Sequence, residues 1–515
     1  RPVVMGKNFA VATSQPLATL AGMEMYWAGG NAVDAAIAMA IALTVVEPTS
    51  NGIGGDAFAL VWDGKLHGLN ASGRSSQNLQ WEVIEQIPEI GWLTVTVPGA
   101  VSAWRSLWEK WGKLPFERLF APAIRHASEG YPVSPITAEA WKRAAAKFLP
   151  LNAPEYQPFK NVFFPQGRAP QAGEIWGSKD HAVTLQEIAA TGGESFYRGK
   201  LAGAIANFAA DTGGLLTRED LARHQPEWVQ PISTTYRDLQ VWEIPPNTQG
   251  IAALMALNIV EGFELQQDPR ESGINYHRQI EAMKLAFADL HHYVGDPQFM
   301  TVTSNQLLDK NYAAERRNLI GDRAMSAVYP GLPSGGTVYL TAADKDFMVS
   351  FIQSNYEGFG SGILIPETGI ALHNRGLGFS LQPGHPNQIA PNKRPFHTII
   401  PSFVSQDNVP LGTLGVMGAP MQPQGHLQVI INLRDYYLNP QAALDAPRWR
   451  LMGSDSVLLE TTVPHHVVLD LVERGHNLKF ASAKMFGKGQ IIMRLNNHVL
   501  IAASESRADG LALAT

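Results

Sequence analysis

Thr337 lies in a stretch whose residue types suit cleavage of the chain on its amino side. If the Gly336–Thr337 bond opens, Thr337 carries a free α-amine beside its own hydroxyl. An amine with a pKa of about 7.7–8.0 can take the hydroxyl proton near neutral pH, which activates a weak nucleophile. Gly336 has no Cβ to block attack on its carbonyl, and Pro333 and Gly335 predict a flexible approach. From these residues alone, an ordinary loop entering a β-strand is the alternative interpretation.

The composition predicts a large folded protein and excludes several classes of function. With 515 residues, 45% of them hydrophobic and 17% charged, the chain can bury a core larger than that of one simple domain. A net charge of -6 without blocks of like charge gives no reason to expect nucleic acid or membrane partners. The absence of cysteine excludes disulfides, thiolate catalysis and cysteine-bound zinc. It leaves the compartment open, with the cytoplasm slightly favoured.

The chain changes texture near Thr337. Up to about residue 330 the pattern is mainly helical, with helices predicted over 17–28, 32–46, 100–111, 116–129 and 275–293. Strands are predicted there over 57–62, 65–71 and 93–97. From Thr337 onward, strands are predicted over 338–342, 348–353, 362–365, 370–373, 402–404, 411–416, 490–495 and 499–503. An amphipathic helix over 425–437 and a second helix over 467–474 interrupt them. The boundary therefore separates residues 1–336 from residues 337–515.

The most apolar segment, residues 35–46, is about twelve residues long and too short to span a bilayer. Asn31 with Asp34 three residues later predicts its start, and Glu47-Pro48 predicts its end. We expect a buried helix that pairs with the helix before it.

Two other kinds of site have weak support in the sequence. His291 and His292, with Asp289 and Asp296 nearby, could suggest a metal, but adjacent helical residues point in different directions. The glycine-rich run at 51–56 follows a helix and lacks the lysine of a phosphate-binding loop. It is better interpreted as a tight turn whose backbone passes near the nucleophile. We therefore expect neither a metal nor another cofactor.

Several motifs resemble the γ-glutamyltransferase family, and they occur in the family's order along nearly the whole chain. They lie at residues 31–38, 47–58, 359–363, 392–395 and 445–448. The resemblance implies an α+β fold of the N-terminal-nucleophile hydrolase type, a four-layer αββα sandwich made as a self-cleaving precursor. It further implies a large subunit, 1–336, and a small subunit, 337–515, that stay together as partners. A homodimer remains open.

The resemblance also implies roles for individual residues. The Thr337 hydroxyl would attack the Gly336 carbonyl and later take the acyl group of an amide. Gly418 and Ala419 stand at the family's oxyanion turn, where alanine is tolerable if its φ is ordinary. The alternative is a plain strand-to-helix turn. Asn355 stands where an asparagine orients the nucleophile's amine.

Arg74 stands where the family's arginine binds the α-carboxylate of a glutamyl group, a task that suits a planar guanidinium. A solvated loop arginine is the alternative. Four further residues replace polar groups of the family, and we count them among the substrate-binding candidates: Tyr339, Gln353, His397 and Thr398.

One departure from the family bears on the substrate. Where γ-glutamyl-specific members hold the substrate's α-ammonium with acidic or amide groups, this chain has Arg375 and Gly378. A cation there repels an ammonium, and the sequence offers no carboxylate to compensate. We therefore expect Arg74 and Arg375 to bracket an acyl group that carries a carboxylate and no amine. Among family members, the branch that includes oxamate amidohydrolase fits best, and glutaryl-side-chain cephalosporin acylases also fit.

The predicted activity is hydrolysis of a small carboxylated amide, oxamate-like or glutaryl-like, through an acyl-enzyme. Water is the expected acceptor, because the short segment 379–393 offers no long lid and predicts an open cleft. A γ-glutamyl hydrolase or transpeptidase acting on glutathione is the first alternative. An inactive carboxylate-binding relative is the second.

Overall fold

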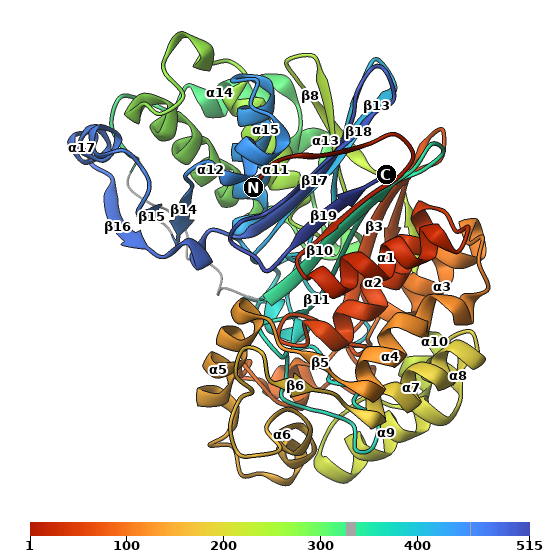
Figure 1. The fold of residues 1–515 in the computed structure, drawn as a ribbon. Coiled ribbons are helices and arrows are strands. Elements are labelled where there is room, and N and C mark those ends of the chain that lie inside the picture. The colour runs from red at the N-terminus through yellow and green to blue at the C-terminus, as the bar shows by residue number, and fades with distance from the viewer. Residues whose placement is uncertain (326–335, 454) are drawn as a thin grey trace.

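Two seven-stranded sheets face each other, and helices cover the outer face of each (Figure 1). The computed structural model describes residues 1–325, 336–453 and 455–515. Every strand pair in both large sheets is antiparallel. This is the four-layer αββα sandwich predicted from the family resemblance. The approach residues Pro333 and Gly335 lie outside the described residues.

We name the large sheets after one central strand each. The β10 sheet has the order β19 (Leu511–Ala514), β2 (Ala10–Thr13), β10 (Gly336–Ala343), β11 (Met348–Tyr356), β3 (Asp56–Trp62), β4 (Leu66–Asn70) and β7 (Glu227–Val229). The β13 sheet has the order β1 (Val4–Gly6), β18 (Leu500–Ser504), β17 (Lys488–Arg494), β13 (Val409–Met417), β12 (Ser402–Gln406), β9 (Leu239–Glu243) and β8 (Ile232–Tyr236).

The helices divide between the two outer layers. On the β10 side lie α1 (Pro16–Trp27), α2 (Ala32–Val46), α3 (Ala100–Trp111), α4 (Ala121–Glu129), α5 (Pro135–Phe148), α6 (Gln157–Phe163), α7 (Lys179–Ala190), α8 (Glu194–Arg198), α9 (Lys200–Thr212) and α10 (Arg218–Arg223). On the β13 side lie α11 (Gly250–Val260), α12 (Gly273–Tyr293), α13 (Ser304–Leu307), α14 (Lys310–Arg317), α15 (Met421–Arg434), α16 (Pro440–Asp445) and α17 (His465–Glu473).

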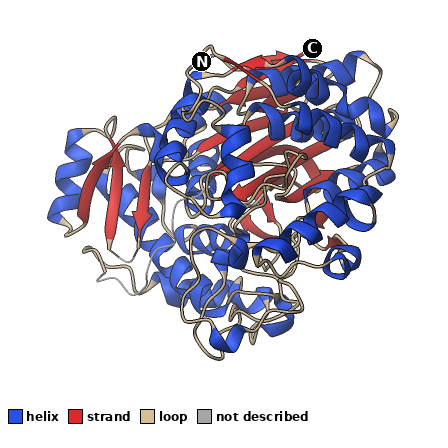
Figure 2. Cartoon of the chain, turned by 90° about the horizontal axis from the view of Figure 1, so that it is seen from below, coloured by secondary structure: helices blue, strands red, loops and turns tan. Residues whose placement is uncertain are grey.

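A small sheet with one antiparallel and one parallel strand pair lies beside α17 (Figure 1) and projects from the sandwich (Figure 2). It consists of β14 (Trp449–Met452), β15 (Ser456–Glu460) and β16 (Asn477–Ala481), and a two-stranded pair elsewhere consists of β5 (Tyr131–Pro132) and β6 (Ile175–Trp176). No helix in the described part of the chain combines the length and apolar character needed to cross a membrane.

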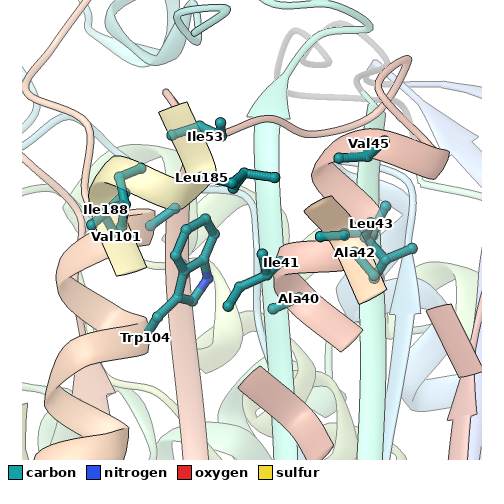
Figure 3. Packing of buried hydrophobic residues seen from close by; sticks show 14 of the residues in the cluster. Ala40, Ile41, Ala42, Leu43, Val45, Ile53, Val101, Trp104, Leu185 and Ile188 are labelled. Carbon is teal, nitrogen blue, oxygen red and sulfur yellow. The ribbon is translucent and has the colours of Figure 1, made fainter. Parts of the chain in front are cut away.

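Helix α2 is the buried helix that its composition predicts, and all of its residues are buried. Asn31 caps it by accepting from the amides of Val33 and Asp34, and the Asp34 carboxylate accepts from the Asn31 amide. Ile41 of α2 and Trp104 of α3 belong to the apolar core that backs the β10 sheet (Figure 3). These helices pack against the outer face of β10 and β11.

Strand alternation gives β10 and β11 one face toward the helices and one toward the β13 sheet. Val338 and Leu340 join the helix-side core, whereas Tyr339 and Ile352 belong to the core between the sheets. Thr341 confirms the second direction, since its hydroxyl bonds to that of Thr413 on β13. The Thr337 side chain follows the same alternation and faces the β13 sheet.

Three predicted strands are wrong. Residues 93–97 contain a 3-10 turn, Trp92–Thr94, closed by a bond from the Thr94 hydroxyl to the Gly91 carbonyl at 2.8 Å. The segments 362–365 and 370–373 form only isolated bridges, among them Leu364 with Ala371. Positive φ values at nearby glycines interrupt any longer ladder there: Gly360, Gly362 and Gly369.

Two predicted helices need correction. The predicted helix over 116–129 is a 3-10 turn, Phe116–Phe120, followed by α4, because Pro122 favours a new helix start. Helix α15 begins at Met421, earlier than predicted, and is buried through Ile431 rather than amphipathic. The other predicted helices and strands are confirmed with shifts of a few residues at their ends.

Candidate active site

Thr337 is the second residue of β10, and its side chain is buried between the sheets, with 1% of the residue exposed. Its Oγ1 lies 3.2 Å from the Oγ of Ser354 on β11. The strand pairing shifts here, since Gly336 pairs with Tyr356, one residue out of step with the rest of the ladder. Bulges of this kind re-aim side chains and are frequent beside active sites.

The cleft predicted to be open is closed in this state. Phe379 and Ile389 of the short segment 379–393 pack against Leu79 in a small apolar cluster. Arg375 has no exposed surface, and Thr337 has almost none. The short segment is therefore packed against the predicted large-subunit part of the chain, and both Thr337 and Arg375 are buried.

A buried carboxylate shares the face on which Thr337 lies. Asp56 of β3 pairs with Ser354 of β11, which places Asp56 one strand beyond the partner of Thr337. Its Oδ2 lies 3.0 Å from Nε2 of His397 and 3.2 Å from Nδ1 of His373. Burial alone would raise the pKa of Asp56, but the two imidazoles hold it well below the usual value. Asp56 is thus a fixed anion.

His397 serves that anion as a neutral donor. Burial first, and then the charge of Arg375, lowers the pKa of His397 to about 3. At neutral pH its Nε2–H therefore donates to Asp56. The other imidazole, His373, faces the carbonyl of Thr96 through Nε2 at 2.9 Å.

Arg375 is the cation of the site. Its guanidinium carbon lies 4.0 Å above the centre of the Tyr356 ring, and Nη1 donates to the Thr398 hydroxyl at 2.9 Å. Its Nε and Nη2 are buried and have no hydrogen-bond partner among the described residues. Burial lowers the pKa of Arg375 to about 10, so the group stays charged at neutral pH. A buried charge with unused donors is costly unless an anion completes it.

Gly418 and Ala419 form the turn between β13 and α15, near Thr398, whose hydroxyl accepts from Arg375. The amide of Gln249 donates both to the carbonyl of Ala419 and to the carbonyl of Thr398. Within the described part of the chain, neither the Gly418 nor the Ala419 N–H donates a hydrogen bond. Both amides are therefore available as donors.

Alanine was expected to be tolerable at this turn if its φ were ordinary, and its φ is not ordinary. Ala419 has φ 52°, in the left-handed region, and Gly418 has φ 130°. A side chain in the left-handed region costs about 1–2 kcal/mol. The turn accepts this strain, and the surrounding helix and strand must hold it in place.

Arg74 is paired with acidic and carbonyl groups of the protein itself. Its Nη1 lies 3.1 Å from Oδ2 of Asp296 and donates to the carbonyl of Asn392, and Glu227 lies 3.8 Å from Nη2. Its carboxylate partners are thus supplied by the protein, at Asp296 and Glu227. Arg74 is neither a solvated loop arginine nor an unpaired carboxylate receptor in this state.

Gln353 and Tyr339 lie on opposite faces of the β10 sheet. Gln353 points to the helix layer, where its amide donates to Asn51 and accepts from the Trp104 indole at 2.9 Å. Tyr339 points between the sheets, and its hydroxyl lies 2.7 Å from that of Ser350. Both side chains have structural partners that do not include Thr337.

Asn355 also lies in the β11 strand, and both ends of its buried amide have no partner in the described part of the protein. The amide rests against two glycines of the run 51–56. A Cβ on Gly52 would stand 2.9 Å from its Nδ2, and one on Gly55 would stand 2.8 Å from its Oδ1. The turn at 51–56 thus passes close to this asparagine, one residue beyond the Ser354 that contacts Thr337.

Sequence reasoning missed four residues that the structure gathers around Thr337 and Arg375. They are Asp56, Ser354, Glu357 and His373. All four lie inside or beside motifs that were recognised, so their positions were available but their side-chain directions were not. Glu357 corrects one inference outright, because a carboxylate does remain near Arg375 to compensate its charge.

The two aspartates that were considered and set aside as metal ligands have other partners. Asp289 bonds to Tyr312 and Arg316, and Asp296 bonds to Arg74. A different group, His277, Glu281 and His476, offers ligand atoms within 4.8 Å of one another.

That second group already has internal partners. Nδ1 of His277 lies 2.8 Å from Nε2 of His476, and the Lys284 ammonium lies 2.7 Å from Oε1 of Glu281. The lysine supplies the positive charge that a metal would bring. We therefore interpret the group as a buried support for residues 321–325, to which His277 and Lys284 also bond.

A threonine at the start of a central strand, two facing antiparallel sheets and two outer helix layers define an enzyme of the N-terminal-nucleophile hydrolase type. The gamma-glutamyltranspeptidase family model matches residues 18–515. The chain belongs to the γ-glutamyltranspeptidase family.

Three similar proteins illustrate the range of that family. A crystal structure of cephalosporin acylase from Bacillus halodurans is 53% identical, covers 100% of this chain and 97% of its own, and superposes with a TM-score of 0.96. The glutathione hydrolase-like YwrD proenzyme of Bacillus subtilis is 34% identical over 99% of both chains. The oxamate amidohydrolase proenzyme of Klebsiella pneumoniae is 33% identical over 96% of both chains.

Proposed function

We propose that this protein is a self-processing threonine amidohydrolase whose substrates are amides with a carboxylate on the acyl group. Residues 1–336 form the large subunit and residues 337–515 the small one. The observation that carries the substrate class is the buried guanidinium of Arg375, with two nitrogens unused by the described residues. An acyl carboxylate would complete it. A relative named cephalosporin acylase and one named oxamate amidohydrolase support an amide substrate.

Self-processing follows from the position of Thr337. Its Oγ1 attacks the Gly336 carbonyl carbon, the C–N bond breaks, and the hydroxyl proton passes to the Thr337 nitrogen. Water then hydrolyses the resulting ester, which leaves a Gly336 carboxylate and a free Thr337 amine. Two relatives of nearly equal length are named proenzymes, which supports this step.

Hydrolysis of the substrate uses the same hydroxyl. The free amine of Thr337 takes the Oγ1 proton, the Oγ1–acyl bond forms, and the leaving amine departs with that proton. The N–H groups of Gly418 and Ala419 are free to stabilise the developing oxyanion, a contribution of about 3–4 kcal/mol for one donor. Asn355 is assigned to orient the new amine, and its unpaired amide among the described residues supports this role. Water then releases the acid.

Arg375 and Thr398 are assigned to the acyl carboxylate, with His397 and Asp56 holding their surroundings in place. Arg74 remains a candidate for a second, outer contact, if a substrate anion displaces Asp296. The γ-glutamyl hydrolase alternative stays open because a carboxylate, Glu357, lies near Arg375.

Replacing the nucleophile tests the mechanism. Thr337→Ala should leave a single uncut chain without amidase activity, because the attacking oxygen is gone. Thr341→Ala is the matched control, because Thr341 lies four residues further along β10 on the same face. This variant should still be cut. A cut or active Thr337→Ala protein would remove the mechanism, and an uncut, inactive wild type would favour the carboxylate-binding relative.

A panel of p-nitroanilides tests the substrate class. We expect Arg375→Gln to raise KM for glutaryl-p-nitroanilide at least tenfold while cleavage at Thr337 persists, because the acyl carboxylate loses its cation and the other Arg375 partners, Thr398 and Tyr356, are uncharged. The uncharged butyryl-p-nitroanilide should be little affected. Equal losses on both substrates would contradict a carboxylate role for Arg375.

A further inference from the structure

The loop that follows β11 puts a second charged side chain beside Arg375. Glu357 comes directly after Tyr356, the residue whose ring supports the Arg375 guanidinium. The Glu357 N–H donates to Oδ1 of Asn374 at 3.1 Å, and Asn374 directly precedes Arg375. The two loop ends are therefore tied together, with one acid and one base at the joint.

The acid and the base do not neutralise each other by direct contact. Oε1 of Glu357 is buried and has no hydrogen-bond partner in the described part of the chain, and the same holds for Nε and Nη2 of Arg375. No ion pair within 4.0 Å joins the two among those residues. Arg375 and Glu357 have opposite charges and unused polar atoms. A ligand with a carboxylate and an ammonium could therefore contact Arg375 with the first group and Glu357 with the second.

The other charged groups around Glu357 are few. Lys147 of α5 and Glu89 act on it along with Arg375, and Lys147 is paired to Glu89 at 3.1 Å. Burial raises the pKa of Glu357 to about 7, Glu89 adds to the rise, and Lys147 and Arg375 oppose it. Glu357 is therefore neutral below about pH 7 and anionic above it, whereas Arg375 stays cationic throughout.

We propose that Glu357 is a specificity-determining residue that selects between acyl groups with a carboxylate alone and acyl groups with a carboxylate and an adjacent ammonium. This rests on the proposed function, in which Arg375 binds the acyl carboxylate. With Glu357 neutral, the remaining anion near Arg375 is Asp56, which already accepts from His397, so the unused Arg375 donors favour a glutaryl-type acid. With Glu357 ionised, an ammonium beside the carboxylate gains a partner, and a γ-glutamyl-type acyl group becomes acceptable.

Two substrates that differ only in the ammonium test the proposal: glutaryl-p-nitroanilide and γ-glutamyl-p-nitroanilide. The cleaved wild-type enzyme is assayed between pH 5.5 and 8.0, where the substrate ammonium stays protonated. We expect the ratio of kcat/KM, glutaryl over γ-glutamyl, to fall about tenfold as pH rises through 7, mainly through KM. Glu357→Gln should make that ratio independent of pH.

Glu367→Gln is the matched control, since Glu367 is exposed on the same connection between β11 and the Arg375 turn. It should keep the wild-type profile. A ratio that stays flat in the wild type, or that still slopes in Glu357→Gln, would overturn the proposal. If Glu357→Gln does not fold, the wild-type profile alone decides. A wild type that hydrolyses neither amide would contradict the proposed function itself, whereas a flat ratio in an active enzyme contradicts only the role of Glu357.

Discussion

Ala419 shows at the scale of one residue how the site stores strain. Its φ of 52° suits glycine far better than alanine, and the same turn presents the N–H groups assigned to the oxyanion. Ala419→Gly should therefore raise the stability of the folded protein by about 0.5–1 kcal/mol, seen as a higher midpoint of thermal unfolding. Ala146→Gly in the exposed face of α5, where φ is helical, should lower it by about 1 kcal/mol. Equal shifts for both variants would contradict strain at Ala419.

The residues that sequence alone could single out, such as Thr337 and Arg375, are those that motifs carry, and their roles stay predictions. What they contact was not predictable, because it depends on how loops close in space. Arg375 meets Tyr356 and approaches Glu357 only because the segment 357–374 folds back on itself. The φ of Ala419 was equally hidden, since alanine normally signals an ordinary backbone. The sequence therefore indicated a cation and missed the acid beside it.

At the scale of elements, periodicity predicted what local rules control. The cap of α2 and the hairpin of β3 and β4 follow from the residues in and next to them. The segments 362–365 and 370–373 alternate like strands but pack as irregular loops, because their glycines adopt positive φ and their partners come from the distant turn at Gly54. An alternating apolar pattern indicates that one side of a segment is buried. It does not indicate whether a neighbouring strand is present to form a ladder.

The bulge between β10 and β11 belongs to the same scale. The regular ladder that pairs Val338 with Gln353 sets Thr337 opposite Ser354, and the one-residue slip comes directly before it at Gly336, where the chain would be cut. No sequence rule places such a slip, since both strands alternate normally on either side of it. The local irregularity is what distinguishes the first residues of β10 from an ordinary strand start.

At the scale of the whole molecule, the predicted secondary structure changes from mainly helical to strand-rich at Thr337. This change divides the sequence but does not divide the fold. β10 and β11 of the proposed small subunit lie between β2 and β3 of the large one, so the β10 sheet is shared. In the β13 sheet, β12 pairs with β9 of the large part, and β18 pairs with β1. Two pieces that share both sheets are one folding unit.

This interleaving predicts the behaviour of the cut protein. After cleavage, residues 1–336 and 337–515 should elute together in native size-exclusion chromatography and separate only on a denaturing gel, because parting them breaks ladders in both sheets. The uncut Thr337→Ala protein should elute at the same volume and give one band. Release of the smaller piece in native buffer would contradict the shared sheets. The cut at one bond therefore changes the chemistry of Thr337 while every layer of the sandwich stays in place.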